Sequence, residues 1–372
     1  MAPFPPVEPL GVAIVGTGFG QKVHIPGLQA YPHTTPVAVY HRDRATAQAI
    51  AQAHGIPQGW DSLEAIVALP QVAAVTLATP PFLHFEMAKT ILKAGKHLLL
   101  EKPTSLTAEE ARVLHDLAQE QGVVGVMDFE YRFVPPWQHL ARLLGQGFVG
   151  KPYLIRIDWL MSSRADSQRP WNWYARRDCG GGVLGALGSH TFDYVHWLFG
   201  PVARMQAHLV TSIAHRPDPV TGTPQPVTAD DVALLTLELA DGTPCQVALS
   251  SVSRQGRGHW VEVYGDQGTL ILGSANQQDY VHGFQLWGAA AGQPLQELPT
   301  PPDLEFATTY PDGRLAPFIR VVDHWVQSIA QGHAPSPNLR DGAYSQLLMD
   351  LAHRSQETSH WVTVPPLDRF LP

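Results

Sequence analysis

Short apolar runs alternate with longer amphipathic segments from Leu10 to about Asp128. The runs are nearly all apolar, which is typical of strands covered on both faces. The predicted strands are Gly11–Val15, Val37–Tyr40, Val72–Ala78, His97–Leu100 and Val123–Met127. The predicted helices between them are Arg44–His54, Ser62–Leu69, Leu83–Ala94 and Ala108–Gln121. Because strands that alternate with helices form parallel sheets, the first half of the chain is predicted to be α/β.

The pattern changes after Arg132, where extended apolar segments are joined by turn signals such as Asp241-Gly242 instead of helices. These segments are Lys151–Leu160, Ala203–Ser212, Val232–Leu239, Cys245–Ser253, Trp260–Tyr264 and Thr269–Leu272. They predict an α+β domain with an open, largely antiparallel sheet, closed by helices at Phe318–Ala330 and Leu339–Ser355. We therefore expect two domains, residues 1–130 and 131–372.

Apolar residues occupy both faces of the predicted strand Val232–Leu239 at its start, because Val232 and Leu234 accompany the inward-facing set. A sheet face left in water alternates more cleanly with polar residues. This strand predicts that the second domain supports a homo-oligomer, a homodimer or a homotetramer.

The composition excludes several classes of protein. The 372 residues carry a formal net charge of −8, which gives no excess of cations for binding the nucleic-acid backbone. No apolar run is long enough to span a membrane, and no signal peptide is visible at the N-terminus. The two cysteines, Cys179 and Cys245, are too few for a disulfide scaffold or a zinc cage. We expect a cytoplasmic enzyme or binding protein with a small-molecule ligand and no nucleic-acid or membrane partner.

The first predicted strand runs directly into Gly16-Thr17-Gly18-Phe19-Gly20. Glycines after a strand permit a tight turn and let backbone amides approach a pyrophosphate at the start of a helix. The third glycine is one position early for G-x-G-x-x-G, and an ordinary strand-to-helix turn is the alternative. In this α/β context, Gly16, Gly18, Phe19 and Gly20 predict a Rossmann domain that binds a dinucleotide.

The second strand ends where NAD-binding proteins carry an acidic residue for the ribose diol, but His41 and Arg42 stand there. A guanidinium offers paired donors to a 2′-phosphate, so these residues favour NADP over NAD. Asp43 comes slightly late for the diol, and Arg42 as a solvated loop cation is the alternative.

Two further segments contain candidate catalytic or binding residues. Lys102 follows the strand His97–Leu100 at the sheet edge where open α/β folds bind ligands, and Glu101 precedes it. Downstream of the glycine run 180–182, His190 and Asp193 share a helix face, whereas His196 is turned away from them. We therefore predict no metal site there. A buried core histidine is the alternative for His190.

The glycine loop, Ala78-Thr79-Pro80-Pro81 with His84, Glu101-Lys102-Pro103, the segment 180–193 and Gly265-Asp266-Gln267-Gly268-Thr269-Leu270 occur in this order. Together they resemble the glucose-fructose oxidoreductase, inositol dehydrogenase and MocA family (Gfo/Idh/MocA). The resemblance covers nearly the whole chain. It implies NAD(P)-dependent oxidoreduction of sugars, cyclitols or related alcohols.

By this resemblance Lys102 and His190 are the catalytic residues. The cofactor is lined by Thr79, Pro80, His84 and Glu101 as well as by Lys102. Asp193 lies on the substrate side, where we also place Arg132 and Trp171, although an aromatic near the glycine run is packing as often as it is a sugar platform.

The chain departs from the family at two positions. Ala186 replaces an aspartate common four residues before the histidine, and Glu130 stands where an asparagine is frequent. Ala186 keeps open a second class of function, a dinucleotide-binding regulator without catalysis. A non-sugar carbonyl is the alternative substrate.

Overall fold

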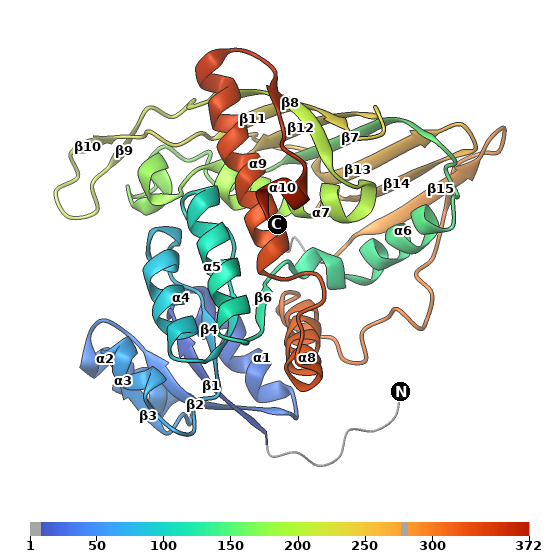
Figure 1. Cartoon of the computed structure of the whole chain (residues 1–372). Helices are drawn as coiled ribbons and strands as arrows, with labels where there is room; N and C mark the ends of the chain where they lie inside the picture. The colour runs from blue at the N-terminus through green and yellow to red at the C-terminus, as the bar shows by residue number, and fades with distance from the viewer. Residues whose placement is uncertain (1–8, 277–281, 372) are drawn as a thin grey trace. The chain divides into compact units, whose positions relative to one another are not determined.

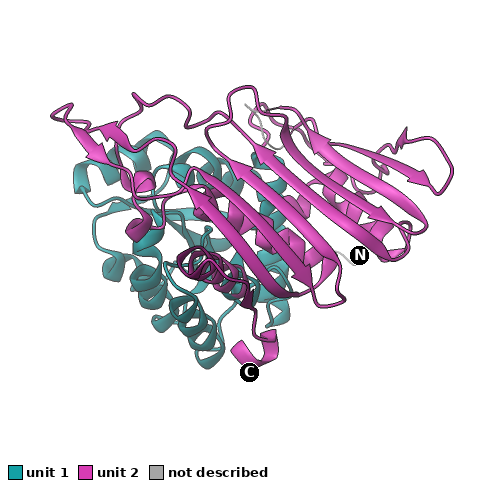
Figure 2. Ribbon diagram, turned by 90° about the horizontal axis from the view of Figure 1, so that it is seen from above, with its two compact units in different colours: residues 1–130, 314–343 teal, residues 131–313, 344–372 magenta. Residues whose placement is uncertain are grey.

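The computed structural model describes residues 9–276 and 282–371, which form two compact units (Figure 2). Unit 1 comprises the described residues up to 130 and residues 314–343, and unit 2 comprises the described residues of 131–313 and 344–371. The first stretch of unit 1 ends at residue 130. Residues 314–343, which the sequence assigned to the second domain, belong instead to unit 1.

Unit 1 is built on a parallel sheet with the strand order β3-β2-β1-β4-β5-β6. Its strands are β1 (Leu10–Val15), β2 (Thr34–Tyr40), β3 (Gln58–Trp60), β4 (Ala74–Leu77), β5 (His97–Leu100) and β6 (Gly125–Met127). This topology confirms the predicted parallel α/β domain. The order reverses between β1 and β4, and ligands of open α/β sheets bind at the carboxyl ends of the strands at such a switch point.

Helices connect these strands (Figure 1). They are a π-helical turn η1 (Gly20–His24) continued by α1 (Ile25–Ala30), then α2 (Arg44–Ala53), α3 (Leu63–Val67), the 3-10 turn η2 (Pro81–Leu83), α4 (His84–Lys93), α5 (Ala108–Glu120) and the 3-10 turn η3 (Glu130–Phe133). Thr107 and Glu110 form a capping box at the start of α5. The returning helix α8 (Leu315–Gln331) packs on α1.

Unit 2 holds a large sheet with the order β16-β15-β14-β13-β7-β12-β11-β8-β17. Its strands are β7 (Pro152–Leu160), β8 (Val202–Val210), β11 (Val232–Leu239), β12 (Pro244–Ser250), β13 (Gly258–Gly265), β14 (Gly268–Ser274), β15 (Gln285–Ala290), β16 (Gln296–Glu297) and β17 (Val362–Thr363). Neighbours are antiparallel except β7 and β12, which are parallel. The predicted largely antiparallel sheet is thus confirmed.

The other elements of this part of the chain are helical apart from one small hairpin. They are α6 (Pro135–Gly145), η4 (Trp173–Ala175), η5 (Arg177–Cys179), the π-helical turn η6 (Leu184–Gly188), α7 (Ser189–Phe199), the hairpin β9 (His215–Pro217) and β10 (Pro224–Pro226), α9 (Leu339–Thr358) and α10 (Leu367–Phe370). Within the described residues, no helix is both long and apolar enough to cross a membrane.

The two sheets differ in how their faces are covered. In unit 1, Val12–Val15 and Ala74–Leu77 are buried throughout, as expected for strands with helices on both sides. In unit 2, the alternate residues of β11 from Ala233 to Leu239 are buried, but Leu234 on the other face is 47% exposed. Among the described residues, the second face of β11 is therefore the more exposed of the two.

Candidate active site

Each of the three glycines after β1 is suited to its position for a different physical reason. Gly16 adopts a φ of +110°, and a Cβ there would lie 2.4 Å from the Ala78 carbonyl carbon. Gly18 is exposed, and a Cβ there would meet nothing within 4 Å. At Gly20 a Cβ would press on Ile14 at 3.3 Å, where the helix crosses β1. These are the turn, the open approach and the close helix packing that a dinucleotide fingerprint needs, despite the early third glycine.

At the end of β2, the acidic side chain is engaged by the chain itself and the arginine is exposed. Asp43 caps α2, since its carboxylate accepts hydrogen bonds from the backbone and the hydroxyl of Thr46 at 2.8 and 2.6 Å. Within the described residues, the exposed Arg42 side chain forms no hydrogen bond or ion pair. The His41 ring lies over the same turn, accepting from the Asp43 N–H at 3.1 Å.

The turns after β4 and β5 are tied together by His84. Its ring lies between the carbonyls of Thr79 at 2.7 Å and Pro103 at 2.8 Å. Burial lowers the pKa of His84, so a neutral ring donates to one of these carbonyls at a time. The Lys102–Pro103 peptide is cis. His84 therefore holds the two loops in place. The neighbouring Thr79 hydroxyl oxygen is buried without a hydrogen-bond partner among the described residues.

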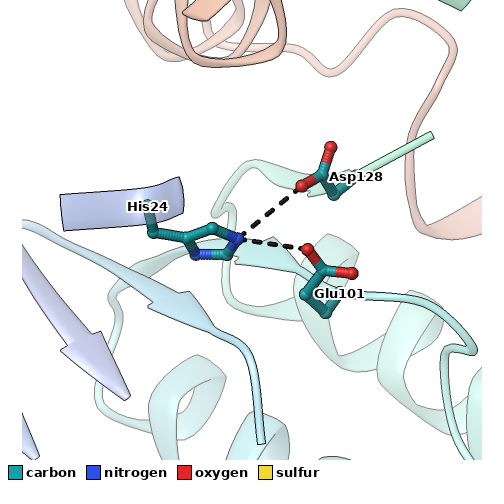
Figure 3. Close-up of side chains that lie close together, drawn as sticks. All are labelled: His24, Glu101 and Asp128. Atoms are coloured by element: carbon teal, nitrogen blue, oxygen red, sulfur yellow. Dashed lines mark hydrogen bonds and ion pairs between the residues drawn. The ribbon is translucent and has the colours of Figure 1, made fainter. Parts of the chain in front are cut away.

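Glu101 belongs to a buried cluster with His24 and Asp128 (Figure 3). The His24 ring points at both carboxylates, with Nε2 3.1 Å from Glu101 Oε1 and 3.7 Å from Asp128 Oδ2. The backbone N–H of Lys102 donates to the other oxygen, Glu101 Oε2, at 3.3 Å. Glu101 is thus held on both of its oxygens, and the half-buried Lys102 follows it in the chain.

The three groups shift one another's ionisation. Burial opposes charge on His24, but the hydrogen bonds and charges of Asp128 and Glu101 outweigh it and raise its pKa to about 9. Burial would raise the pKa of Glu101, yet the bond to His24 holds it below its usual value. Burial and the Glu101 charge raise the pKa of Asp128 to about 7, against the opposing effect of His24. The cluster therefore holds an imidazolium beside an ionised Glu101.

Glu130 extends this group. Burial, reinforced by the charges of Asp128 and Glu101, raises its pKa well above the usual value, although Lys102 and Arg314 oppose the shift. A neutral carboxyl can donate a hydrogen bond, as the amide of the asparagine frequent in the family does. The raised pKa therefore makes Glu130 take up a proton, and with it an O–H donor, more readily than an ordinary glutamate does.

Sequence reasoning missed His24 and Asp128. Asp128 directly follows β6, so the rule that placed Glu101 and Lys102 at the carboxyl edge of the sheet also applied to it. His24 ends the π-helical turn η1, and π turns often mark functional sites. Its meeting with Glu101 depends on the path of the chain after the glycine loop, which the hydrophobic pattern does not show.

In unit 2, His190 is buried near the start of α7, directly after the π-helical turn η6. Its ring meets the edge of Tyr131 at a centroid distance of 5.0 Å. Asp193 accepts two bonds from Arg132, from Nε at 2.9 Å and from Nη2 at 2.6 Å. Both partners are buried, so the structure brings together two of the residues predicted for the substrate side, as an ion pair.

The glycine run and Trp171 are engaged by the chain itself. A Cβ at Gly181 would lie 2.3 Å from the Tyr174 carbonyl oxygen, and one at Gly182 would lie 2.7 Å from the Asp230 carboxylate. Other segments of the chain thus lie against the backbone of this run. The Trp171 indole donates to the Pro226 carbonyl at 2.9 Å.

The parallel sheet, the glycine loop and the polar groups at its carboxyl edge define a dinucleotide-binding oxidoreductase. Residues 10–129 match the model described as "Oxidoreductase family, NAD-binding Rossmann fold", and residues 141–364 match "Oxidoreductase family, C-terminal alpha/beta domain". The chain belongs to the Gfo/Idh/MocA oxidoreductase family, and it is an NAD(P)-dependent oxidoreductase.

Similar proteins span its whole length. An uncharacterized oxidoreductase of Synechocystis sp. is 55% identical and aligns over 97% of this chain and 98% of its own. The levoglucosan dehydrogenase of Pseudarthrobacter phenanthrenivorans is 26% identical over 97% of this chain and all of its own. A solved levoglucosan dehydrogenase in complex with NADH and L-sorbose shares the fold, with a TM-score of 0.87 and 24% identity over 96% of this chain and all of that one.

The residues present fit an NAD(P) cofactor. Gly18 leaves its backbone open to close approach, and the buried Thr79 hydroxyl awaits a partner. Both belong to the turns after β1 and β4, which flank the switch point of the sheet.

Proposed function

We propose that this enzyme is a dehydrogenase or reductase acting on a CH–OH group of a sugar, cyclitol or related alcohol. The observation that carries the proposal is Lys102, which stands beside the doubly held Glu101 at the same sheet edge as the glycine loop. The likeness to a levoglucosan dehydrogenase over nearly the whole chain supports the substrate class.

Oxidation of an alcohol breaks a C–H bond and an O–H bond. A bound nicotinamide supplies the acceptor for the hydride. Lys102 and His190 act on the proton: one group takes it from the hydroxyl as the carbonyl forms, and returns it in the reverse direction.

The substrate side is formed by Trp171 and by the Arg132–Asp193 pair. Because each carboxylate oxygen of Asp193 already accepts a bond from Arg132, the pair acts by fixing the face of α7 that carries His190. Trp171 offers an indole to an apolar sugar face while its N–H stays bound to Pro226.

We further propose a preference for NADP over NAD. The support is that Asp43 is committed to capping α2, whereas Arg42 is exposed and unengaged within the described part of the chain. A free guanidinium suits a 2′-phosphate.

The test is a screen of sugars, sugar acids, anhydrosugars and inositols with each oxidised cofactor, followed by the absorbance of the reduced nicotinamide. Turnover of at least one polyol that is lost in Lys102→Ala is the expected result. Tight cofactor binding without turnover of any compound, carbonyls in the reverse direction included, would favour the non-catalytic regulator. Ala186 is the observation behind that second candidate, since a methyl group cannot accept a hydrogen bond from a histidine.

A further inference from the structure

The His24 side chain is clamped in a fixed orientation. Its ring stacks on Phe318 of α8 at a centroid distance of 4.4 Å and an interplanar angle of 13°. The edge contact with Phe19 has a centroid distance of 5.6 Å. With 0% of its surface exposed, the ring has no room to turn away from the carboxylates.

This clamped ring supplies the donor that Glu101 needs. A buried carboxylate is stable in its charged form only when donors or cations satisfy it. Glu101 Oε1 receives the His24 bond and Oε2 receives the Lys102 backbone N–H. The turn after the glycine loop is thereby connected through one carboxylate to the proposed catalytic lysine.

We propose that His24 is a positioning residue, which fixes the Glu101 carboxylate beside Lys102 and the cofactor loop, with Asp128 as its second counter-charge. This inference rests on the proposed function. It adds a residue, on the helix after the glycine loop, that neither the motifs nor the family likeness assigned.

The charges around His24 come from each neighbouring strand end and from α8. Glu101 and Asp128 face it directly; Lys102 acts on Glu101, and both Lys102 and Arg314 act on Glu130, whose carboxyl interacts with Asp128 and Glu101. Asp128 is 2% exposed, and its Oδ2 pairs with His24 Nε2 at 3.7 Å. Loss of the His24 charge would leave Asp128 and Glu101 facing each other, so that one of them takes up a proton.

The experiment compares His24→Leu, which removes donor and charge, with His24→Gln, which retains an N–H donor and removes the charge. His259→Gln is the matched control, because His259 is also buried and ring-stacked but has no carboxylate partner in the described structure. Cofactor dissociation constants are measured by nicotinamide fluorescence on the full chain, and kcat and KM are measured from pH 6 to 10.

We expect His24→Leu to weaken cofactor binding and lower kcat by roughly 10- to 150-fold, the range for a charged buried hydrogen bond. His24→Gln should recover part of this loss. The wild type and His259→Gln should lose kcat above about pH 9, where His24 loses its proton, and His24→Gln should lack that alkaline limb.

Three results would overturn the inference. One is a His24→Leu enzyme with wild-type cofactor affinity, kcat and pH profile. Another is an equal loss in His24→Gln and His24→Leu with the alkaline limb kept. The third is a stoichiometric divalent metal in the purified wild type that is missing from His24→Gln, since the three side chains would then be its ligands. Should His24→Leu not fold, His24→Gln and Glu101→Gln give the same readouts.

Failure of the proposed function looks different. In that case the wild type turns over no alcohol or carbonyl, while the cofactor affinities of the His24 variants still report on Glu101.

Discussion

Each unit buries a histidine stacked on an aromatic ring, and the two have opposite ionisation. His24 in unit 1 lies on Phe318, and His259 in unit 2 lies on Trp159 at 4.0 Å and 4°. Their exposed fractions are 0% and 3%. The pKa of His24 is raised to about 9, whereas burial lowers that of His259 to about 3.

The hydrogen-bond partners explain the difference. The chain of donors from His259 Nε2 runs to the Tyr194 hydroxyl at 3.1 Å, on to Thr191 Oγ1 at 3.1 Å and then to the Leu187 carbonyl at 3.0 Å. Each hydroxyl donates once in this direction, which assigns a proton to Nε2. The ring is neutral because burial, with no carboxylate beside it, lowers its pKa. Within the described residues His259 Nδ1 has no partner.

Burial alone thus removes the charge from a histidine, and two carboxylates restore it. Unit 1 concentrates charged groups at the carboxyl edge of its parallel sheet, while the aromatic cluster of unit 2 around Tyr131 is held by neutral contacts. From this contrast we expect Lys102, which follows Glu101 in unit 1, to contribute more to proton transfer than His190 in unit 2.

The largest expected effect tests this division directly. Lys102→Ala should nearly abolish turnover, by about 10²- to 10⁴-fold, because it removes the acid/base group beside Glu101. His190→Ala should cost less, about tenfold to a hundredfold, since Ala186 offers no carboxylate to fix the imidazole tautomer. Steady-state rates after a cofactor-binding check provide the measurement. Equal losses would show that the Asp193–Arg132 pair supports His190 as fully as Glu101 supports Lys102.

A second prediction concerns stability against pH, where the two histidines have opposite signs. The raised pKa of His24 contributes stability that is complete below about pH 6.5 and is lost as pH rises through about 9. The lowered pKa of His259 contributes stability that is present above about pH 6.5 and is lost as pH falls toward 3. Between pH 6.5 and 9 the His24 contribution amounts to at most about 3 kcal/mol.

Urea unfolding at several pH values measures this effect. His24→Gln should flatten the decline in stability between pH 6.5 and 9, and His259→Gln should leave that decline intact. The same decline in all three proteins would mean that His24 is neutral in the folded state, and the contrast between the units would fail.

The elements of unit 1 were predictable because parallel strands are contiguous apolar runs bounded by helices. The strand Gln58–Trp60 was missed, since it has three residues and a central glycine. The parallel pairing of β7 with β12 and the return of α8 to unit 1 were also missed. Both depend on long-range pairing, which local patterns do not encode.

For the site, too, the residues that follow a strand could be predicted, but the contacts between residues far apart in the sequence could not. Lys102 and Glu101 follow a strand, so the sheet-edge rule located them. The role of His24 depends on Phe318, which lies far away in sequence and reaches it only through the packing of α8 on α1. Equally, Asp193 and Arg132 were each predicted, but their mutual bonding was not.

A third, smaller predicted effect concerns cofactor binding by Arg42, a charged residue of unit 1 that follows β2. Arg42→Ala should weaken NADPH binding about tenfold or more and leave NADH binding nearly unchanged, because a charged hydrogen bond contributes about 1.5–3 kcal/mol. Arg44→Ala is the matched control, since Arg44 lies in the same region but stacks on Trp60 and pairs with Asp61. The test is to measure the dissociation constants of NADPH and NADH for the wild type and both variants. NADH bound by the wild type as tightly as NADPH would refute the preference.

The smallest predicted effect is on the oligomeric state, and it concerns the more exposed face of β11 in unit 2. Unlike the strands of unit 1, β11 exposes Leu234 beside the polar residues Thr236 and His208. We expect a second copy of the chain to cover this face, so light scattering at micromolar concentration should report a dimer or tetramer. Leu234→Glu should shift the population toward the 40.7 kDa monomer. The shift should be partial, because burying half a leucine contributes only about 1 kcal/mol per copy. Val220→Glu, at a 91% exposed site after β9, should leave the mass unchanged. A wild type that is monomeric throughout would show that the apolar start of β11 is compatible with water, and that the two sheets differ in coverage without any consequence for assembly.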